Sequence, residues 1–296
     1  MNVVSTSPSG TEILYALGVE PVAVSHSCDY PPGVEELPTI DTSRVDAEAS
    51  ADRHQQVEES TRSGHVYRID SEVLRTVEPD LVLTQGVCGV CAVDESLIDE
   101  TLADLDVDPE VLALHANELD DLYECIKRVG RAVGRGERAE SLVGELKERV
   151  RTVEQRASSR TASPRVAVFE WMDPPRLAGN WVPELIESAG GTPLLVEPGD
   201  RTSELDWQTF LDAGPEVIVV APCGFDVDRT EARLHELAYR EGWAELPAVQ
   251  QGRVYGVDGA AYFNRWTPRL IESLERLDRI LTDEKSTLPD GVRRLV

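Results

Sequence analysis

Two cysteines, Cys88 and Cys91, stand in a Cys-x-x-Cys spacing within TQGVCGVCAVDES (residues 84–96). Paired thiols at this spacing occur in zinc knuckles and in thiol redox pairs. A structural zinc site needs four ligands, and the sequence has no second knuckle pair. A thioredoxin-type pair follows an aromatic residue, whereas Gly86 and Val87 precede Cys88 here. A third interpretation, reduced thiols that line a pocket, therefore stays open beside the metal and redox interpretations.

Two further cysteines follow other predicted strands, so four thiols could converge on one site. As ligands of a thiolate-bound metal or cluster we consider Cys28, Cys88, Cys91 and Cys223. Cys125 lies on the apolar stripe of a predicted helix and is expected to be a core residue. His26 and His65, both in predicted loops, are further candidates for axial metal ligands.

A degenerate internal repeat indicates which elements position these residues. SPSGTEILYALGVEPVAVS (7–25) and VEPDLVLTQGVCG (77–89) have counterparts in NWVPELIESAGGTPLLVE (180–197) and AGPEVIVVAPCG (213–224). Each half predicts a helix ending in Gly, a strand, and a second buried strand with the composition of a parallel sheet. Ligands of open α/β sheets lie beyond the carboxyl ends of such strands.

The segment between the halves predicts a long amphipathic helix within residues 136–159 that joins two α/β lobes with parallel sheets. We expect an N-terminal lobe over 1–116, a helical connector over 117–160 and a C-terminal lobe over 161–296, with the ligand cleft between the lobes. A single domain is the alternative.

Composition restricts the class of protein. A net charge of -26 excludes nucleic acid as a partner. With only three lysines, it favours adaptation to high salt over an ordinary acidic protein. The start of the chain, MNVVSTSPSG, has no basic or apolar signal region, and the cysteines are few and odd in number. These features predict a cytoplasmic location; the alternative is an extracellular, membrane-anchored protein whose export signal is removed or lies upstream.

Several segments together resemble the solute-binding proteins of importers for cobalamin, haem and iron-siderophores. They are SPSGTEILYALG, CDYPP, RIDSEVLRTVEPDLVLTQ and GWAELPAVQQGRVYGVDG, and the resemblance covers about residues 2–282. CDYPP and EWMDPP are most similar to cobalamin-binding members. The resemblance implies two Rossmann-like lobes joined by one long helix, and a cleft for a metal chelate. It also places Glu72 where family members dock on the transporter permease; the second lobe offers Trp207 at the matching position, with Glu204 nearby.

Aromatic residues at predicted strand ends are the other site candidates, because a corrin or porphyrin buries mostly flat apolar surface. As ligand-binding residues we predict Tyr30, Trp171, Trp181, Phe225, Tyr262, Phe263 and Arg265. Glu170 and Arg176 lie near the same predicted rim. Trp207 and Trp243 lie in helical patterns and are expected to be core residues.

We therefore expect a monomeric, non-catalytic solute-binding protein that delivers a corrinoid or a related small-molecule metal chelate to an ABC transporter permease. It requires no cofactor, although cobalamin or another chelate could be bound. No sequence motif for an enzyme nucleophile, a Walker loop or a metalloprotease is present. The alternative is an intracellular metal or cluster carrier that uses the four cysteines as ligands.

Overall fold

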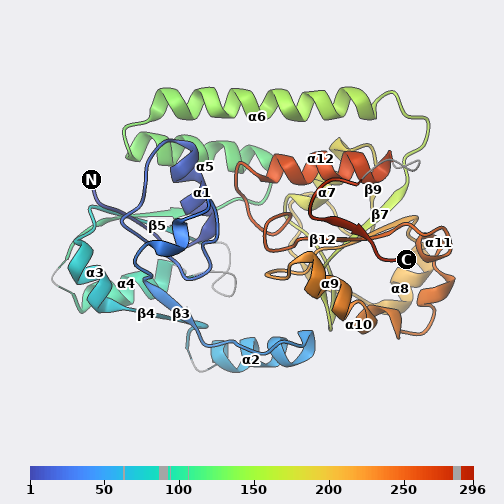
Figure 1. The fold of residues 1–296 in the computed structure, drawn as a ribbon, viewed down its shortest axis with the longest axis horizontal. Coiled ribbons are helices and arrows are strands. Elements are labelled where there is room, and N and C mark those ends of the chain that lie inside the picture. Colours follow the sequence, from blue (N-terminus) through green and yellow to red (C-terminus); the bar gives the residue numbers. More distant parts are fainter. Residues whose placement is uncertain (63, 87–92, 94, 106, 283–287) are drawn as a thin grey trace. The chain divides into compact units, whose positions relative to one another are not determined.

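A computed structural model describes residues 1–62, 64–86, 93, 95–105, 107–282 and 288–296 (Figure 1). The chain divides into two compact units. The first unit comprises residues 1–48, 52–116 and 120–144, and the second comprises residues 49–51, 117–119 and 145–296.

The sheet of the first unit has the strand order β2-β1-β5-β6, with all neighbouring strands parallel. Its strands are β1 (Val3–Ser5), β2 (Ala23–Val24), β5 (Leu81–Gln85) and β6 (Glu110–Leu114). Every residue of β5 is buried, as the run LVLT predicts for an inner parallel strand. A separate antiparallel pair is formed by β3 (Asp41–Ser43) and β4 (Tyr67–Ile69).

Local sequence explains where the helices of the first unit begin. The helical segments are α1 (Pro8–Ala16), η1 (Val34–Glu36), α2 (Ser50–Arg62), α3 (Ser71–Val77), α4 (Glu95–Ala103) and α5 (Leu119–Ala132). The Ser7 hydroxyl accepts a hydrogen bond from the backbone N–H of Gly10 and so caps α1. Asp70 caps α3 by accepting from the N–H groups of Glu72 and Val73. Both caps satisfy backbone donors that have no partner within the helix.

The predicted long helix is confirmed as α6 (Gly136–Ala157). Its residues up to Gly144 belong to the first unit, and Glu145 onwards belong to the second. In the first unit α6 packs closely on α5, because a Cβ atom at Gly130 would lie 2.4 Å from that of Ala139. None of the helices in the described part of the chain has the length and apolar character of a membrane span.

The larger sheet of the second unit contains a similar parallel frame. Strands β9-β7-β11-β12 repeat the order of the first unit, and antiparallel strands extend this sheet on both sides. Its strands are β7 (Arg165–Met172), β8 (Pro175–Leu177), β9 (Thr192–Pro193), β10 (Ser203–Glu204), β11 (Val217–Val220), β12 (Val254–Val257) and β13 (Val292–Arg294). The predicted strand VIVV is β11, and each of its residues is buried.

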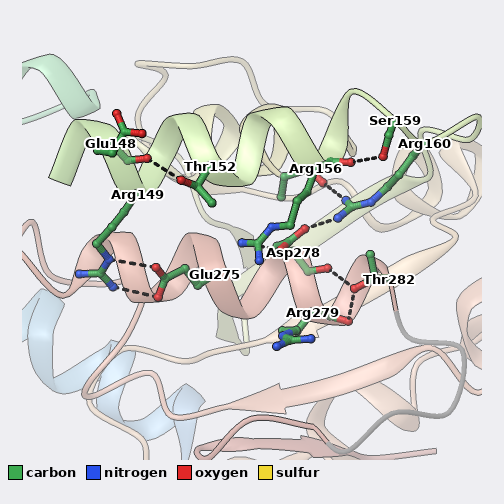
Figure 2. Close-up of polar contacts among 11 residues, drawn as sticks. Glu148, Arg149, Thr152, Arg156, Ser159, Arg160, Glu275, Asp278, Arg279 and Thr282 are labelled. Atoms are coloured by element: carbon green, nitrogen blue, oxygen red, sulfur yellow. Dashed lines mark hydrogen bonds and ion pairs between the residues drawn. The ribbon is translucent and has the colours of Figure 1, made fainter. Parts of the chain in front are cut away.

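Helices cover this sheet and build the core of the second unit. They are α7 (Val182–Ser188), α8 (Trp207–Ala213), α9 (Val227–Arg233), α10 (His235–Ala238), η2 (Trp243–Glu245), α11 (Pro247–Gln250) and α12 (Leu270–Leu281). Figure 2 shows α12 beside the second half of α6. Arg149 forms a two-pronged ion pair with Glu275, at 2.9 and 2.8 Å. Arg156 and Arg160 both contact the carboxylate of Asp278, whose side chain is only 4% exposed.

The α/β class with parallel sheets is thus confirmed. One hairpin was not predicted. β7 continues to Met172 and the chain folds back as β8, which pairs antiparallel with β7. The pattern of hydrophobic residues does not reveal this hairpin, because the return strand is only three residues long.

Candidate functional site

An aromatic platform lies at the carboxyl ends of β7 and β11 in the second unit. The rings of Trp171 and Phe225 meet edge to face, with their centroids 5.7 Å apart and their planes at 66°. The guanidinium carbon of Arg229, on α9, lies 3.9 Å from the centroid of the Phe225 ring. Phe225 is fully buried, whereas Trp171 is half-buried. Trp171 is therefore partly exposed while its ring contacts the buried ring of Phe225.

Backbone contacts fix the loops that carry this platform. The carbonyl of Phe225 accepts hydrogen bonds from the N–H groups of Gly259 (2.8 Å) and Ala260 (3.1 Å). A Cβ atom at residue 259 would lie 2.2 Å from the carbonyl oxygen of Pro222, so only glycine permits this approach. The loops after β11 and β12 are consequently held against each other.

Polar contacts also position the strand that carries Trp171. The indole N–H of Trp171 donates to the carbonyl of Asp173 at 3.1 Å, and the Asp173 carboxylate pairs with Arg240 at 2.8 Å. The carboxylate of Glu170 accepts from the Thr202 hydroxyl at 2.7 Å. Arg176 lies in β8, on the return strand of the hairpin, and is half-buried.

The loop after β12 adds a second half-buried ring, that of Tyr262. The guanidinium carbon of Arg276 lies 3.6 Å from its centroid, and an Arg276 nitrogen donates to its hydroxyl at 2.6 Å. Burial raises the pKa of the Tyr262 phenol, with Arg276 acting in the opposite direction, so the hydroxyl stays neutral near pH 7. Tyr262 is therefore a neutral aromatic surface with a fixed orientation.

The remaining predicted contacts of the second unit occupy different environments. Phe263 is buried, and its carbonyl accepts from the indole N–H of Trp181 at 2.6 Å; Trp181 is buried as well. Together they support the loop after β12. Arg265, two residues further along the chain, is half-buried.

The corresponding edge of the first unit is polar. Asp41 is buried and accepts three hydrogen bonds, which we call the Asp41 network: from the Ser25 hydroxyl (2.9 Å), the His26 N–H (2.7 Å) and His26 Nδ1 (3.0 Å). Ser25 and His26 directly follow β2. Tyr30, in the same turn, is exposed.

The predicted thiols are distributed over the chain. Cys28 is buried in the first unit, with its sulfur 3.2 Å from the Thr11 hydroxyl, and Cys223 is half-buried in the second unit. Cys88 and Cys91 lie outside the described residues. Within the residues that are described, no group of three or more histidine, cysteine, aspartate or glutamate side chains is arranged to hold a metal ion.

Some side chains that shape these sites were not predicted. Asp41, Arg229 and Arg276 lie 15, 4 and 14 residues from the side chains they contact. For Arg229 the helical spacing after Phe225 was an available signal. For Asp41 and Arg276 the contact depends on tertiary structure, which a local pattern does not encode.

A surface hollow of about 620 Å³ lies elsewhere in the second unit, between the end of α6 and α7. Its described lining is polar and acidic, with Glu154, Glu184 and Glu187 and no aromatic residue. Such a lining does not suit a flat apolar ligand.

Comparisons with known proteins cover nearly the whole chain. It is 24% identical to the uncharacterised ABC transporter substrate-binding lipoprotein YvrC of Bacillus subtilis, over 93% of this chain and 78% of that protein. It is 22% identical to a vitamin B12-binding protein of Vibrio cholerae, over 93% and 87%. Among solved structures, the periplasmic haem-binding protein RhuT of Roseiflexus matches with a TM-score of 0.70 and 22% identity, over 95% of this chain and 97% of that one.

These relatives are binding proteins and not enzymes, as the sequence predicts. The expected cytoplasmic location is wrong, because the matching family is periplasmic and one relative is a lipoprotein. The alternative of an intracellular metal or cluster carrier finds no support. The family model described as periplasmic binding protein matches residues 3–261. The chain therefore belongs to the periplasmic binding protein family and is a solute-binding protein of the ABC-import type.

Proposed function

We propose that this solute-binding protein binds a corrinoid, with a related metal chelate as the next candidate, for import by an ABC transporter. The observation that carries the proposal is the platform at the ends of β7 and β11. There the half-buried Trp171 ring is supported by Phe225 and Arg229, and half-buried Tyr262 follows β12.

The chemistry of these side chains favours a large flat ligand. A macrocycle buries apolar surface on aromatic rings, while polar groups at its rim need a few fixed partners. Trp171 and Tyr262 would supply ring contacts, and Arg265 a polar contact at the rim. Trp181, Phe225 and Phe263 would act from beneath, because they are at most 6% exposed. Tyr30 is the proposed contact from the first unit.

The choice of a corrinoid over haem or a siderophore rests on similarity to the vitamin B12-binding protein of Vibrio cholerae and on the CDYPP and EWMDPP segments. Haem stays the nearest competitor, because the solved structures that match include haem-binding proteins. The chelate is cargo and not a resident cofactor.

The proposed partner is the permease of an importer, and we propose that the protein acts as a monomer. Glu72, at the start of α3, has a side chain that is 84% exposed, and it pairs with Arg75 within the same helix. A carboxylate in this position is available for docking. A Glu72→Arg variant should bind the chelate normally yet stimulate the importer's ATPase less than wild type, with Glu59→Arg on α2 as a control.

The test of ligand identity is calorimetry with cyanocobalamin, haemin and a ferric catecholate siderophore, in high salt under reducing conditions. We expect heat of binding with cyanocobalamin. Trp171→Ala should weaken binding by about 1 to 3 kcal/mol, the range of a buried aromatic anchor. Tyr239→Ala is the control, because this aromatic residue of the second unit is 86% exposed and its ring lies beside His235 rather than on the platform residues.

Tight binding of haemin alone would replace the corrinoid by haem. The absence of heat with all three ligands, from protein shown to be folded by circular dichroism, would contradict the proposal.

A further inference from the structure

His26 is held at the carboxyl end of β2 by the Asp41 network, through both its backbone N–H and its ring. Its ring nitrogen Nδ1 lies 3.0 Å from Asp41 Oδ1, and the side chain is one-third exposed while the carboxylate is fully buried. The ring also packs against Tyr67, with centroids 5.7 Å apart. The imidazole is thus fixed in orientation at the carboxyl end of β2.

The hydrogen bond to Asp41 determines which nitrogen is available. An ionised carboxylate only accepts hydrogen bonds, so Nδ1 carries the proton and donates it. The lone pair of the neutral ring then resides on Nε2. A carboxylate that fixes the orientation of a histidine ring in this way is a recurrent feature of metal-binding imidazoles.

A hydrolytic function for Ser25, His26 and Asp41 does not agree with the contacts. The Ser25 hydroxyl donates to Asp41 Oδ2 at 2.9 Å. In a nucleophilic triad the hydroxyl would donate to the imidazole, which would remove its proton. The serine here instead satisfies the second oxygen of the buried carboxylate, so the arrangement supports the orientation of His26.

We propose that His26 coordinates the metal ion of a bound chelate through Nε2, with Asp41 as the residue that positions it. One protein ligand is sufficient when a macrocycle supplies the equatorial donors and leaves an axial position open. The inference rests on the proposed function, since it requires that a metal chelate is the cargo. It adds a specificity rule, because a chelate whose axial positions are blocked by inert ligands would lose this contact.

Two cobalamins separate these cases. Aquacobalamin carries an exchangeable water on cobalt, whereas cyanocobalamin carries a firmly held cyanide. In the proposed step the bond between cobalt and the water oxygen breaks and a bond from cobalt to Nε2 forms. The water leaves to solvent, and the oxidation state of cobalt does not change.

The experiment follows the visible absorption spectrum as each cobalamin is titrated with wild-type protein. We expect a shift with aquacobalamin and none with cyanocobalamin. His26→Ala should abolish the shift and reduce aquacobalamin affinity by at least the roughly 10- to 100-fold that loss of an outer-shell partner costs a metal site. Its affinity for cyanocobalamin should stay within about twofold of wild type.

Two further variants complete the design. Asp41→Asn should retain the shift but weaken aquacobalamin binding. His65→Ala is the matched control, because its Nε2 lies 3.2 Å from the exposed carboxylate of Glu100, and it should behave as wild type. If haemin is the chelate that binds, the same comparison is made on its Soret band.

The outcomes separate the two proposals. Binding with identical spectra for wild type and His26→Ala would overturn the role of His26 and leave the proposed function intact. An equal loss of the shift in His65→Ala would also overturn it. Failure of folded wild-type protein to bind any of the chelates would overturn both.

Discussion

The two units share a strand order but differ at the carboxyl end of one central strand, which is β1 in the first unit and β7 in the second. In the first unit β1 ends at Ser5, and Ser7 immediately caps α1. In the second unit β7 runs on to Met172 and returns as β8 before α7 begins. The same parallel frame therefore ends in a capped turn in one unit and in a hairpin that carries Trp171 in the other.

The side chains at these edges differ in the same sense. The first unit places a buried carboxylate with three hydrogen bonds at the end of β2, whereas the second places aromatic rings and arginines at the ends of β7 and β11. One edge is held by internal polar contacts and fixes an imidazole. The other offers apolar surface. The parallel strands determine which edge of each unit can contact a ligand. The side chains at that edge determine the chemistry of the contact.

The largest effect is expected where the polar edge is broken. Asp41→Ala removes the acceptor of three hydrogen bonds, which come from the buried Ser25 hydroxyl and from the backbone N–H and Nδ1 of His26. We expect this variant to lower the free energy of unfolding of the first unit by about 3 kcal/mol. Asp46→Ala, which removes an exposed carboxylate five residues later, is the control and should cost less than about 1 kcal/mol.

The distribution of tryptophan allows this loss to be assigned to one unit. All five tryptophans lie at or beyond residue 171, in the second unit. Circular dichroism should therefore report an earlier transition in Asp41→Ala, while the midpoint of tryptophan fluorescence changes much less. Equal shifts of both signals would show that the units unfold together, and the comparison would no longer separate them.

A somewhat smaller effect is expected from the matching change in the second unit. Asp278→Ala removes the shared partner of Arg156 and Arg160 and loosens α12 from α6 (Figure 2). Because the Arg156 side chain is half exposed, we expect a loss of about 2 kcal/mol. Here the fluorescence midpoint should fall with the dichroism. Glu148→Ala, which breaks an exposed pair with Arg151, is the control and should have little effect.

Sequence reasoning succeeded where local pattern and fold agree. The apolar runs of β5 and β11 and the amphipathic stripe of α6 are properties of short segments, and the structure has them where they were expected. It failed for β8, whose three residues carry no period, and it did not find Asp41. The three bonds to Asp41 join residues 15 or 16 positions apart, and such a contact depends on the pairing of distant strands.

The location failed for a different reason. The absence of a signal region at the start of a given chain, and the count of its cysteines, are weak evidence of compartment. Similarity over nearly the whole chain to a substrate-binding lipoprotein outweighs both.

Salt should sharpen the comparison by acting on surface charge and not on the buried contacts. The dispersed net charge of -26 repels itself over a Debye length of ~10 Å at 0.1 M salt and ~3 Å at 1 M. We expect the melting temperature of wild type to rise with KCl, by roughly 2 to 4 °C for each kcal/mol gained. The difference between wild type and Asp41→Ala should stay nearly constant, because the Asp41 carboxylate itself is fully buried. Equal melting temperatures at 0.1 M and several molar KCl would contradict salt adaptation.

The smallest effect concerns the thiols, and it again contrasts the units. Cys125, on α5 of the first unit, is buried and donates to the carbonyl of His115 at 3.1 Å, and burial raises its pKa to about 11. Thiolate is the reactive form, so only roughly one Cys125 in a thousand is reactive at pH 8. Cys223, in the second unit, is half-buried and accessible to reagent.

Brief alkylation at pH 8 followed by peptide mass mapping should therefore modify Cys223 well before Cys125. The raised pKa fixes the sign of the pH effect: the rate at Cys125 should increase about tenfold for each pH unit until it levels off near pH 11. Alkylation in denaturant, where burial is lost, is the control and should modify both cysteines at similar rates. Fast modification of Cys125 in the folded protein at pH 8 would mean that α5 opens readily, and that the first unit is held less firmly than its buried contacts indicate.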